Sequence, residues 1–336
     1  MKIIIDAFGG DNSPQEVIAG TIEAIEIRKD FTAVLVGKPD AIELELKNYV
    51  YPKDRIEILP ASEVITCEEE PTLAVRRKPE ASINVGFKEL KENPDAKAFV
   101  SAGSTGAYLV GATLRLGRIK GVNRPALCPT LPTVDGDKKV ILLDCGANAD
   151  CKPINLCQFA IMGSTYAKVM GVENPKVALL SNGTEDAKGN ALNHEVFPLL
   201  KEMKEINFVG NCEARDILSG NYDVIVSDGF SGNVALKSIE GGISSLMKLL
   251  KSEIYSSFKG KIGGLLLKST FKKLAKKMDH NNNGGALFVG VEKVVIKAHG
   301  SSKRTAFKNA ILQATEYASM GLAEKLKESI VVENNG

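Results

Sequence analysis

Short runs of aliphatic and β-branched residues alternate with helical patterns along almost the whole chain, and this alternation limits the fold more than any other feature of the sequence. The expected strands cover residues 3–5, 33–36, 56–59, 98–100, 140–143, 177–180, 208–210, 224–226 and 294–296. The expected helices cover residues 14–28, 81–91, 105–116, 155–170, 191–203, 231–251 and 303–327. Strands that alternate with helices form βαβ units, whose parallel strands build a sheet covered on both faces. The sequence therefore predicts an α/β fold, a three-layer αβα sandwich with a Rossmann-like, mostly parallel sheet.

Loops built from Gly, Ser, Thr, Asn and Asp follow six of the expected strands. The candidate binding residues in these loops are Asp6, Gly9, Gly10, Gly103, Ser104, Thr105, Gly106, Asp144, Asn148, Asn182, Asp228, His299 and Ser301. In an open α/β sheet the carboxyl ends of the strands share one edge, and ligands bind in the crevice there. Glycines let backbone N–H groups approach a ligand, and hydroxyls and helix N-termini add donors for an anion. The loops predict a phosphate-like ligand, although any single βα turn needs small polar residues for purely structural reasons.

The sequence lacks the specific nucleotide-binding motifs. No G-x-G-x-x-G follows a strand, and no G-x-x-x-x-G-K-[ST] occurs. The stretch 102–106 also lacks the G-x-S-x-G spacing of a serine nucleophile elbow. A free phosphate that acts as the nucleophile needs neither motif, but it needs cationic and N–H donors and a further donor for the developing oxyanion.

The length of the chain, 336 residues, suits one large domain with a substantial core. We expect a single catalytic α/β domain over residues 1–330, with two lobes around a cleft. Residues 118–132 are rich in Gly and Pro and are placed to link the lobes. Residues 246–280 are expected to protrude as an amphipathic helical segment, and residues 331–336 to form a frayed tail.

The cysteines and histidines do not follow the spacing of a metal site. None of the six cysteines forms a C-x-x-C pair, and no H-E-x-x-H occurs among the three histidines. Buried, reduced thiols are the expected state of these cysteines. We expect no metal and no cofactor.

A lysine-rich segment from Met247 to Met278 combines basic and large apolar residues, while the whole chain has a net charge of only +2. This pattern is typical of a segment that lies in the headgroup layer of an anionic membrane. Its apolar run is too short to cross a bilayer, which takes about 20 residues. The expected membrane-contact residues are Leu265, Leu266, Leu267, Phe271, Lys272 and Lys273. The alternative is a helical hairpin that packs on the core and keeps a solvated lysine face.

The N-terminus carries no pattern of a cleavable signal sequence, because the first apolar run is three residues long and meets Asp6. No stretch is long and apolar enough to suggest a transmembrane span. We expect a cytoplasmic protein that attaches peripherally to the inner face of the cell membrane.

Taken together, the loops resemble those of a known family. The matching stretches are IDAFGGDNSP, SAGSTGA, RPALCPTLPT, LLDCGANAD, NGTEDAKGN, VGNCEARDI, VSDGFSGNV, GGALFVGV and IKAHGSS. In this order they resemble the bacterial phosphate acyltransferase family PlsX from Lys2 to about Lys327. The resemblance implies an enzyme that converts acyl-acyl carrier protein and inorganic phosphate to acyl-phosphate for phospholipid synthesis. Phe8, Ser104, the stretch 278–283 and the stretch 79–81 depart from the family's usual residues.

Two catalytic residues are implied by the resemblance, Lys188 in NGTEDAKGN and Asn233 in DGFSGN. A lysine ammonium suits a phosphate and a developing oxyanion, and an amide near a helix start suits a thioester carbonyl. The structural alternatives are an exposed loop lysine for Lys188 and a helix cap for Asn233. His299 either assists the leaving thiolate or shapes its loop by hydrogen bonds.

The expected partners follow from the same resemblance. They are an acyl carrier protein, inorganic phosphate, an anionic membrane surface, a downstream membrane glycerol-3-phosphate acyltransferase and a second copy of the chain; no nucleic-acid partner is expected. Because acyl carrier proteins are acidic, basic surface at Arg76, Arg77, Lys78 and the lysine-rich segment is expected to attract them.

Two rival functions remain open at this stage. The predicted sandwich is also the architecture of isocitrate and isopropylmalate dehydrogenases, so a metal-dependent dehydrogenase is one alternative. The other is a non-catalytic membrane scaffold that keeps the fold. A short-chain phosphotransacetylase would share the chemistry but would use coenzyme A.

Overall fold

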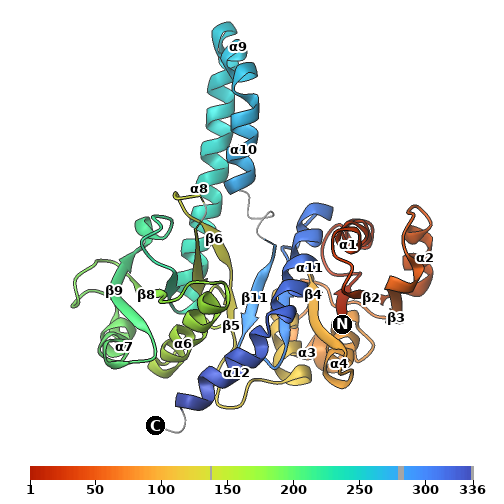
Figure 1. Ribbon diagram of the computed structural model, residues 1–336, viewed down its shortest axis with the longest axis horizontal. Coiled ribbons are helices and arrows are strands. Elements are labelled where there is room, and N and C mark those ends of the chain that lie inside the picture. The colour runs from red at the N-terminus through yellow and green to blue at the C-terminus, as the bar shows by residue number, and fades with distance from the viewer. Residues whose placement is uncertain (137, 279–283, 334–336) are drawn as a thin grey trace.

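Two mixed sheets form the middle layer of the molecule in a computed structural model that describes residues 1–136, 138–278 and 284–333 (Figure 1). The first sheet contains, in spatial order, β3 (Ile56–Pro60), β2 (Thr32–Gly37), β1 (Lys2–Asp6), β4 (Ala96–Ser101), β12 (Val294–Lys297), β11 (Ala286–Val289) and β5 (Ala126–Cys128). The second contains β6 (Thr130–Pro132), β7 (Lys139–Leu143), β10 (Val224–Val226), β8 (Lys176–Ser181) and β9 (Asn207–Glu213). Within the described residues, β11 pairs antiparallel with β12 and β5, β6 pairs antiparallel with β7, and the other strand pairs are parallel.

The strands are buried on both faces because successive side chains point to opposite sides. In β1, Ile3 and Ile5 join one apolar cluster, whereas Ile4 joins another on the opposite face. In β7, Ile141 shares the cluster of Ile3, and Leu142 belongs to a third cluster. A strand that is apolar at every position needs a helical layer on each side. These clusters confirm the predicted three-layer sandwich.

The helices supply the two outer layers. One layer, which covers the same side of both sheets, contains α1 (Gln15–Ile27), α2 (Pro39–Leu46), α6 (Pro153–Val169), α7 (Ala191–Glu202), α11 (Arg304–Ser319) and α12 (Leu322–Glu333). On the opposite side, α3 (Pro71–Arg77), α4 (Ser82–Glu92) and α5 (Thr105–Gly111) cover the first sheet, and the start of α8 (Gly229–Ser256) covers the second. Short helical turns lie at Lys53–Arg55, Ala112–Leu116 and Ala214–Asp216.

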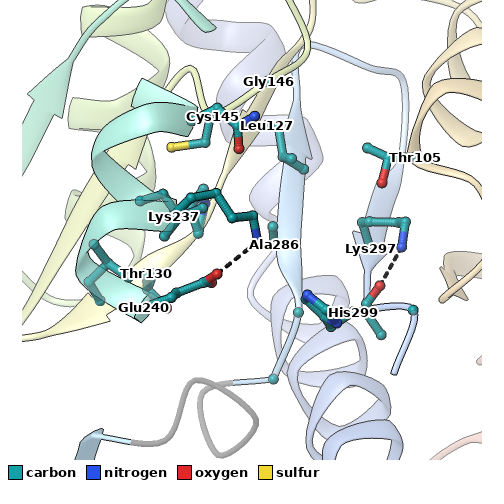
Figure 2. A pocket seen from close by; sticks show the side chains of 18 residues that line it. Thr105, Leu127, Thr130, Cys145, Gly146, Lys237, Glu240, Ala286, Lys297 and His299 are labelled. Atoms are coloured by element: carbon teal, nitrogen blue, oxygen red, sulfur yellow. Dashed lines mark hydrogen bonds and ion pairs between the residues drawn. The ribbon is translucent and has the colours of Figure 1, made fainter. Parts of the chain in front are cut away.

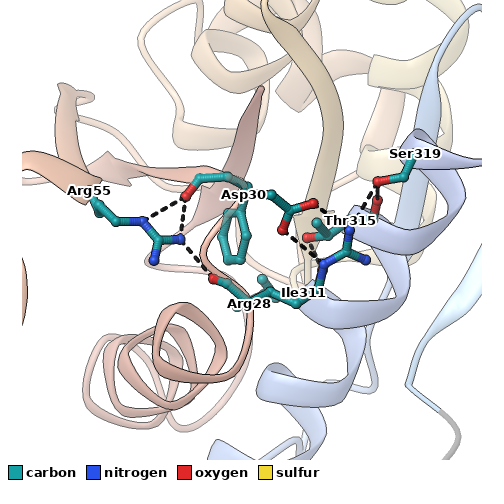
Figure 3. Close-up of polar contacts among 7 residues, drawn as sticks. Arg28, Asp30, Arg55, Ile311, Thr315 and Ser319 are labelled. Carbon is teal, nitrogen blue, oxygen red and sulfur yellow. Dashed lines mark hydrogen bonds and ion pairs between the residues drawn. The ribbon is translucent and has the colours of Figure 1, made fainter.

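The turn after α1 is fixed by two arginines (Figure 3). Arg28 donates to Asp30 at 2.5 and 2.9 Å and to the Ser319 hydroxyl of α11 at 3.1 Å. Arg55 donates to the backbone oxygens of Ile25, Arg28 and Phe31. These bonds satisfy carbonyl groups that the end of α1 leaves without helical partners, and they tie α1 to α11.

A helical arm extends away from the sheets (Figure 1). It consists of the outer part of α8, α9 (Phe258–Leu266) and α10 (Lys268–Met278). Large apolar side chains on the arm are exposed, among them Phe258 at 79% and Leu266 at 78%. No helix in the described ranges is long and apolar enough to cross a membrane. The expected segment 246–280 coincides with the arm up to Met278, and residues 279–280 lie outside the described residues.

Some boundaries differ from the sequence prediction. The segment 118–132 carries β5 and β6, and the chain passes from one sheet to the other at Pro129. The helix expected at 303–327 is two helices, since Gly321 adopts a positive φ of 66° after the end of α11. The strand β11 and the helices α2 and α3 were not among the predicted elements. The expected tail overlaps α12, which continues to Glu333, while residues 334–336 lie outside the described part of the chain.

Candidate active site

A cavity of about 390 Å³ lies where strand ends of the two sheets face the start of α8. Figure 2 shows Lys237 and Glu240 of α8 on one side and Thr105, Lys297 and His299 on the other. The full lining is Thr105, Leu127, Pro129, Thr130, Leu131, Cys145, Gly146, Asn233, Leu236, Lys237, Glu240, Gly284, Gly285, Ala286, Lys297, Ala298, His299 and Gly300. The loops after β7 and β12 therefore meet the first residue of α5, which follows β4, and the start of α8, which follows β10, at one cavity. The loops after β1 and β8 do not line it.

Lys297 is the buried cation of this cavity. It ends β12 with only 8% of its surface exposed, and its Nζ donates to the backbone oxygen of Ala298. Burial lowers the pKa of its ammonium to about 8, although the carboxylates of Asp6 and Asp11 act in the opposite direction. An ammonium carries three donors, and buried lysines are rare unless paired. Lys297 therefore has donor capacity for an anion in the cavity.

The face of α8 supplies the opposite wall. Asn233, Lys237 and Glu240 lie at i, i+4 and i+7, which places them on one side of a helix. Lys237 donates to Glu240 at 2.7 Å, so its charge is partly neutralised. Asp228 caps the helix by accepting from the Ser231 N–H at 2.8 Å, and it does not line the cavity. The exposed side chain of Asn233 remains within the lining beside Gly146.

The loop after β4 is held by a buried hydrogen-bond network. The Ser101 hydroxyl donates to Asp6 at 2.7 Å and accepts from the Gly103 N–H at 3.0 Å. Burial raises the pKa of Asp6, and the bond from Ser101 opposes that effect. Ser104 caps α5 by accepting from the Ala107 N–H at 3.4 Å. The network thus positions Thr105, which lines the cavity, while Asp6 itself is closed off from it.

The glycines of the first loop make this arrangement possible. A Cβ on Gly9 would come within 2.7 Å of both the Asp6 carboxylate and the Ser101 hydroxyl. Gly10 has a φ of +95°, a conformation that side chains other than glycine rarely adopt. Both glycines therefore allow the loops behind the cavity to pack closely, and neither lines the cavity itself. Ser301 is exposed and does not line the cavity either.

Asp144 organises the loop after β7. Its fully buried carboxylate accepts from the N–H groups of Leu127 at 2.9 Å and Asn148 at 2.7 Å, and from the Asn148 side chain at 2.8 Å. Burial raises the pKa of Asp144, and these bonds oppose the shift. The result is a fixed loop that presents Gly146 to the cavity.

Lys188 does not line this cavity. It is an exposed residue of the loop after β8, in which Asn182 accepts from the Gly189 N–H at 2.9 Å. Asn182 and Gly189 line a hollow of about 790 Å³ together with Ser231 and other α8 residues on a different face from Asn233. The first turns of α8 therefore separate the loop of Lys188 from the cavity that Asn233 lines.

His299 lines the cavity, with its Nδ1 turned toward its own loop. The Ser301 N–H donates to Nδ1 at 3.3 Å, and the Ser301 hydroxyl lies 2.9 Å from the same nitrogen. Nδ1 is therefore an acceptor for the backbone of the loop.

Sequence reasoning did not select Lys297, Lys237 or Glu240. The available signal for Lys297 was its position at the junction of an apolar strand and a glycine-containing loop, IKAHGSS. For the α8 pair, the signal was the i, i+3 spacing of opposite charges one turn after Asn233.

The fold and the cationic cavity define an α/β protein with a ligand site at strand ends between two sheets. Solved structures share this architecture. A phosphotransacetylase from Streptococcus pyogenes matches with a TM-score of 0.61 at 16% identity, over 95% of this chain and 94% of that one. A branched-chain phosphotransacylase from Enterococcus faecalis V583 gives 0.58 at 13% identity, over 95% and 99%. A 4-hydroxythreonine-4-phosphate dehydrogenase from Klebsiella pneumoniae gives 0.52 at 12%, over 95% and 99%. At these identities the likeness establishes the fold alone.

Sequence comparison identifies the family. The model of the fatty acid synthesis protein family matches residues 1–325. The phosphate acyltransferase of Clostridium novyi (strain NT) is 50% identical over 331 residues, 98% of each chain, and that of Clostridium tetani is 46% identical over 332 residues, also 98% of each. The phosphate acyltransferase of Bacillus cereus (strain G9842) is 49% identical over 317 residues, 94% of each. The chain belongs to this family of acyltransferase enzymes, and the resemblance inferred from the loops is confirmed.

Proposed function

We propose that this enzyme transfers an acyl group from acyl carrier protein to inorganic phosphate and releases acyl-phosphate for phospholipid synthesis. Family membership supports acyl transfer to phosphate in lipid synthesis. The observation that carries the proposal is the buried ammonium of Lys297 in a cavity built by strand-end loops. A positive charge held in a low-dielectric cavity binds an anion strongly and orients it for reaction.

The reaction is a direct displacement. A phosphate oxygen attacks the thioester carbon, the carbon–sulfur bond breaks, and the carrier leaves as a thiolate that takes up a proton from solvent. The lining offers one side-chain thiol, Cys145, which burial keeps protonated because its pKa lies well above the usual range. Its Sγ–H donates to the Leu142 oxygen at 3.5 Å. Cys145 is thus a poor nucleophile, and an acyl-enzyme on this residue is disfavoured.

The roles of the site residues form part of the proposal. Lys297 holds phosphate, with Thr105 and the Gly146 loop as further donors, and the Asn233 amide donates to the thioester carbonyl as negative charge develops there. Lys188 is the second proposed catalytic cation. Its loop lies on the other side of the first turns of α8 from this cavity, so the role requires the loop to approach the reacting groups. His299 shapes the wall of the cavity through its loop.

The helical arm adds a peripheral membrane contact. Leu265, Leu266 and Leu267 sit at the junction of α9 and α10 and are 69%, 78% and 50% exposed. Lys272 and Lys273 are exposed within the next turns. Apolar insertion together with attraction to anionic headgroups would hold the enzyme at the cytoplasmic face of the membrane, close to a membrane acyltransferase that consumes the product. Pairing of two chains would strengthen this attachment by avidity.

The test is phosphate-dependent release of free carrier thiol from palmitoyl-acyl carrier protein. Wild-type enzyme is expected to release thiol and to form acyl-phosphate in equal amounts, and release should stop when phosphate is omitted. A protein that binds the carrier and releases no thiol would overturn the proposal and favour the scaffold function. Turnover of acetyl-coenzyme A in preference to the acyl carrier thioester would place the donor in the coenzyme A class instead.

A further inference from the structure

A second cationic cavity lies next to the catalytic one and is not used by the proposed reaction. It encloses about 400 Å³ and is lined by three arginines from separate parts of the chain: Arg76 in the last turn of α3, Arg118 after the helical turn Ala112–Leu116, and Arg124 in the loop before β5. The remaining lining residues are neutral: Thr72, Leu109, Val110, Thr113, Leu114, Asn123, Pro125, Ala147 and Asn148. No carboxylate belongs to it.

The three guanidinium groups have little internal compensation. In the described residues, none of them forms an ion pair with a carboxylate, and the one hydrogen bond among their side chains runs from Arg118 to the Asn123 backbone oxygen. Glu70 interacts with Arg76, but its carboxylate already accepts from the N–H groups of Leu73 and Thr72 at the start of α3. Those two bonds, and to a smaller extent the charge of Arg76, lower the pKa of Glu70. Three exposed arginines around one hollow, without carboxylate partners among the described residues, favour an anionic ligand.

The two cavities share structural elements. Thr105 at the start of α5 lines the catalytic cavity, and Leu109 and Thr113, further along the same stretch, line the arginine cavity. At about 1.5 Å per residue, the eight residues from Thr105 to Thr113 span roughly 12 Å. Gly146 faces the first cavity and Ala147 the second. A ligand anchored at the arginines and reaching past α5 and this loop would therefore deliver its other end to Lys297.

We propose that the Arg76–Arg118–Arg124 cavity binds the phosphate group of the phosphopantetheine arm that carries the acyl thioester. The inference rests on the proposed function, since it assigns the far end of the same donor. The arm is a flexible chain with an anion at one end and the thioester at the other, which suits a cationic cavity that adjoins the reaction cavity along α5 and the loop after β7. Arginine suits a phosphate because its planar fork donates two parallel hydrogen bonds. The anchored end also offsets part of the entropy lost when the thioester is positioned.

The experiment compares two small donors, S-octanoyl-phosphopantetheine and S-octanoyl-pantetheine, which differ only in the phosphate. Wild-type enzyme should show a KM about tenfold or more lower for the phosphorylated donor, the range expected for charge-assisted hydrogen bonds. The double variant Arg76→Gln/Arg124→Gln should lose this preference, while its KM for the unphosphorylated donor stays unchanged. Arg118 is left in place because it also holds the Asn123 backbone. Arg77→Gln is the matched control, since Arg77 is an exposed neighbour on α3 that does not line the cavity.

Several outcomes would overturn the inference. They are an equal KM of wild type for the two donors, a preference that survives in the double variant, or an equal loss in Arg77→Gln. A raised KM for inorganic phosphate would assign the cavity to the co-substrate instead, and a changed sedimentation coefficient would assign it to an interface between copies. Calorimetric binding of phosphopantetheine itself, to wild type and the double variant, needs no turnover. It therefore tests binding at the arginine cavity even if the enzyme does not catalyse the proposed reaction.

Discussion

Gly232, in the first turn of α8, lies against the backbone carbonyl group of Asp144. A Cβ at Gly232 would come within 2.0 Å of that oxygen and within 2.5 Å of the Ser227 hydroxyl. The same loop is held by the buried Asp144 carboxylate, which accepts from the N–H groups of Leu127 and Asn148. The close approach therefore fixes where α8 begins relative to the second sheet, and with it the position of Asn233 and Lys237 along the cavity.

Gly232→Ala is expected to lower the free energy of unfolding by about 1–3 kcal/mol, because the new methyl group overlaps backbone atoms that cannot move without breaking the Asp144 network. Gly241→Ala, in the middle of the same helix, is the control: no atom lies within 4 Å of its added Cβ. That substitution should raise the free energy of unfolding by about 0.5–1 kcal/mol through helix propensity. Urea denaturation of the two variants measures both effects, and equal stabilities would contradict the close packing.

The fold was predictable because its signals are local. The apolar run Ile3–Ile5 predicts a strand from its own residues, and the patterns between such runs predict helices in the same way. Strands that are buried on both faces require two helical layers. The division into two sheets was not predictable in this way. It depends on the short strands Ala126–Cys128 and Thr130–Pro132, which pair with the distant strand β11 and with the next strand β7, and their own Gly- and Pro-rich sequence does not indicate strands.

The candidate site was predictable only in outline. The strand-end loops reveal which segments lie near the sheet edge, but not which side chain faces the cavity. Thr105, Asn233 and His299 do line it. Asp6 and Asp144 instead belong to buried hydrogen-bond networks. The burial of Lys297 was not predictable from the sequence, because a lysine that ends a strand is usually solvated. Whether a side chain lines the cavity or belongs to a buried network depends on contacts between residues far apart in the sequence.

Lys297→Met is expected to separate activity from stability. Replacing a buried ammonium by an apolar side chain of similar length removes a desolvation cost, so the variant should be as stable as wild type or more stable by about 1–3 kcal/mol. Without the cation, kcat/KM for phosphate should fall by about a hundredfold or more. Thermal unfolding and initial rates measure the two effects. A destabilised variant with normal kcat/KM would show that Lys297 is structural.

Activity should also depend on pH through Lys297. Its folded-state pKa of about 8 lies below the ordinary lysine value of 10.5, so the charged form is lost as pH rises through 8. We therefore expect kcat/KM for phosphate to decline above about pH 8. Lys297→Arg, whose guanidinium stays charged, should keep whatever activity it has across this range. Loss of one proton should lower kcat/KM by roughly tenfold per pH unit above the pKa. A wild-type kcat/KM that does not change between pH 7 and 9.5 would contradict this role of Lys297.

Deprotonation of Lys297 should also change the free energy of unfolding with pH. Below about pH 8 both states hold the proton and the folded state carries the full cost of the buried charge. Between about 8 and 10.5 the folded lysine is neutral while the unfolded one still binds a proton, so the free energy of unfolding rises with pH across this window. The full gain is roughly 3 kcal/mol at 1.36 kcal/mol per unit. Because other groups titrate here, the measurement is the difference between wild type and Lys297→Met, whose curve should lack this rise.

Lys188→Ala and Asn233→Ala test the two catalytic roles that are proposed for these residues. Asn233 lines the cavity and is assigned to the developing oxyanion, so Asn233→Ala should lower kcat by about a hundredfold with little change in KM. Lys188 is an exposed residue of the loop after β8. The proposed role as a second cation predicts a loss in kcat of similar size in Lys188→Ala, and an unchanged kcat would remove Lys188 from the mechanism. Lys201→Ala, another exposed lysine, which pairs with Asp186 of the same loop, is the control and should retain activity.

The exposed leucines at the end of the arm should control membrane attachment. Replacing Leu265, Leu266 and Leu267 with glutamate puts three negative charges where apolar insertion is proposed and opposes the attraction of nearby lysines to anionic lipid, so binding to phosphatidylglycerol vesicles should be lost. The side chains are 50–78% exposed, and the substitution is therefore not expected to unfold the sheets. Leu44→Glu on α2, 67% exposed and far from the arm along the chain, is the control and should still co-sediment with vesicles. Thiol release from acyl carrier protein in solution should be retained in the triple variant. Unchanged vesicle binding by that variant would show that the arm serves a contact other than the membrane.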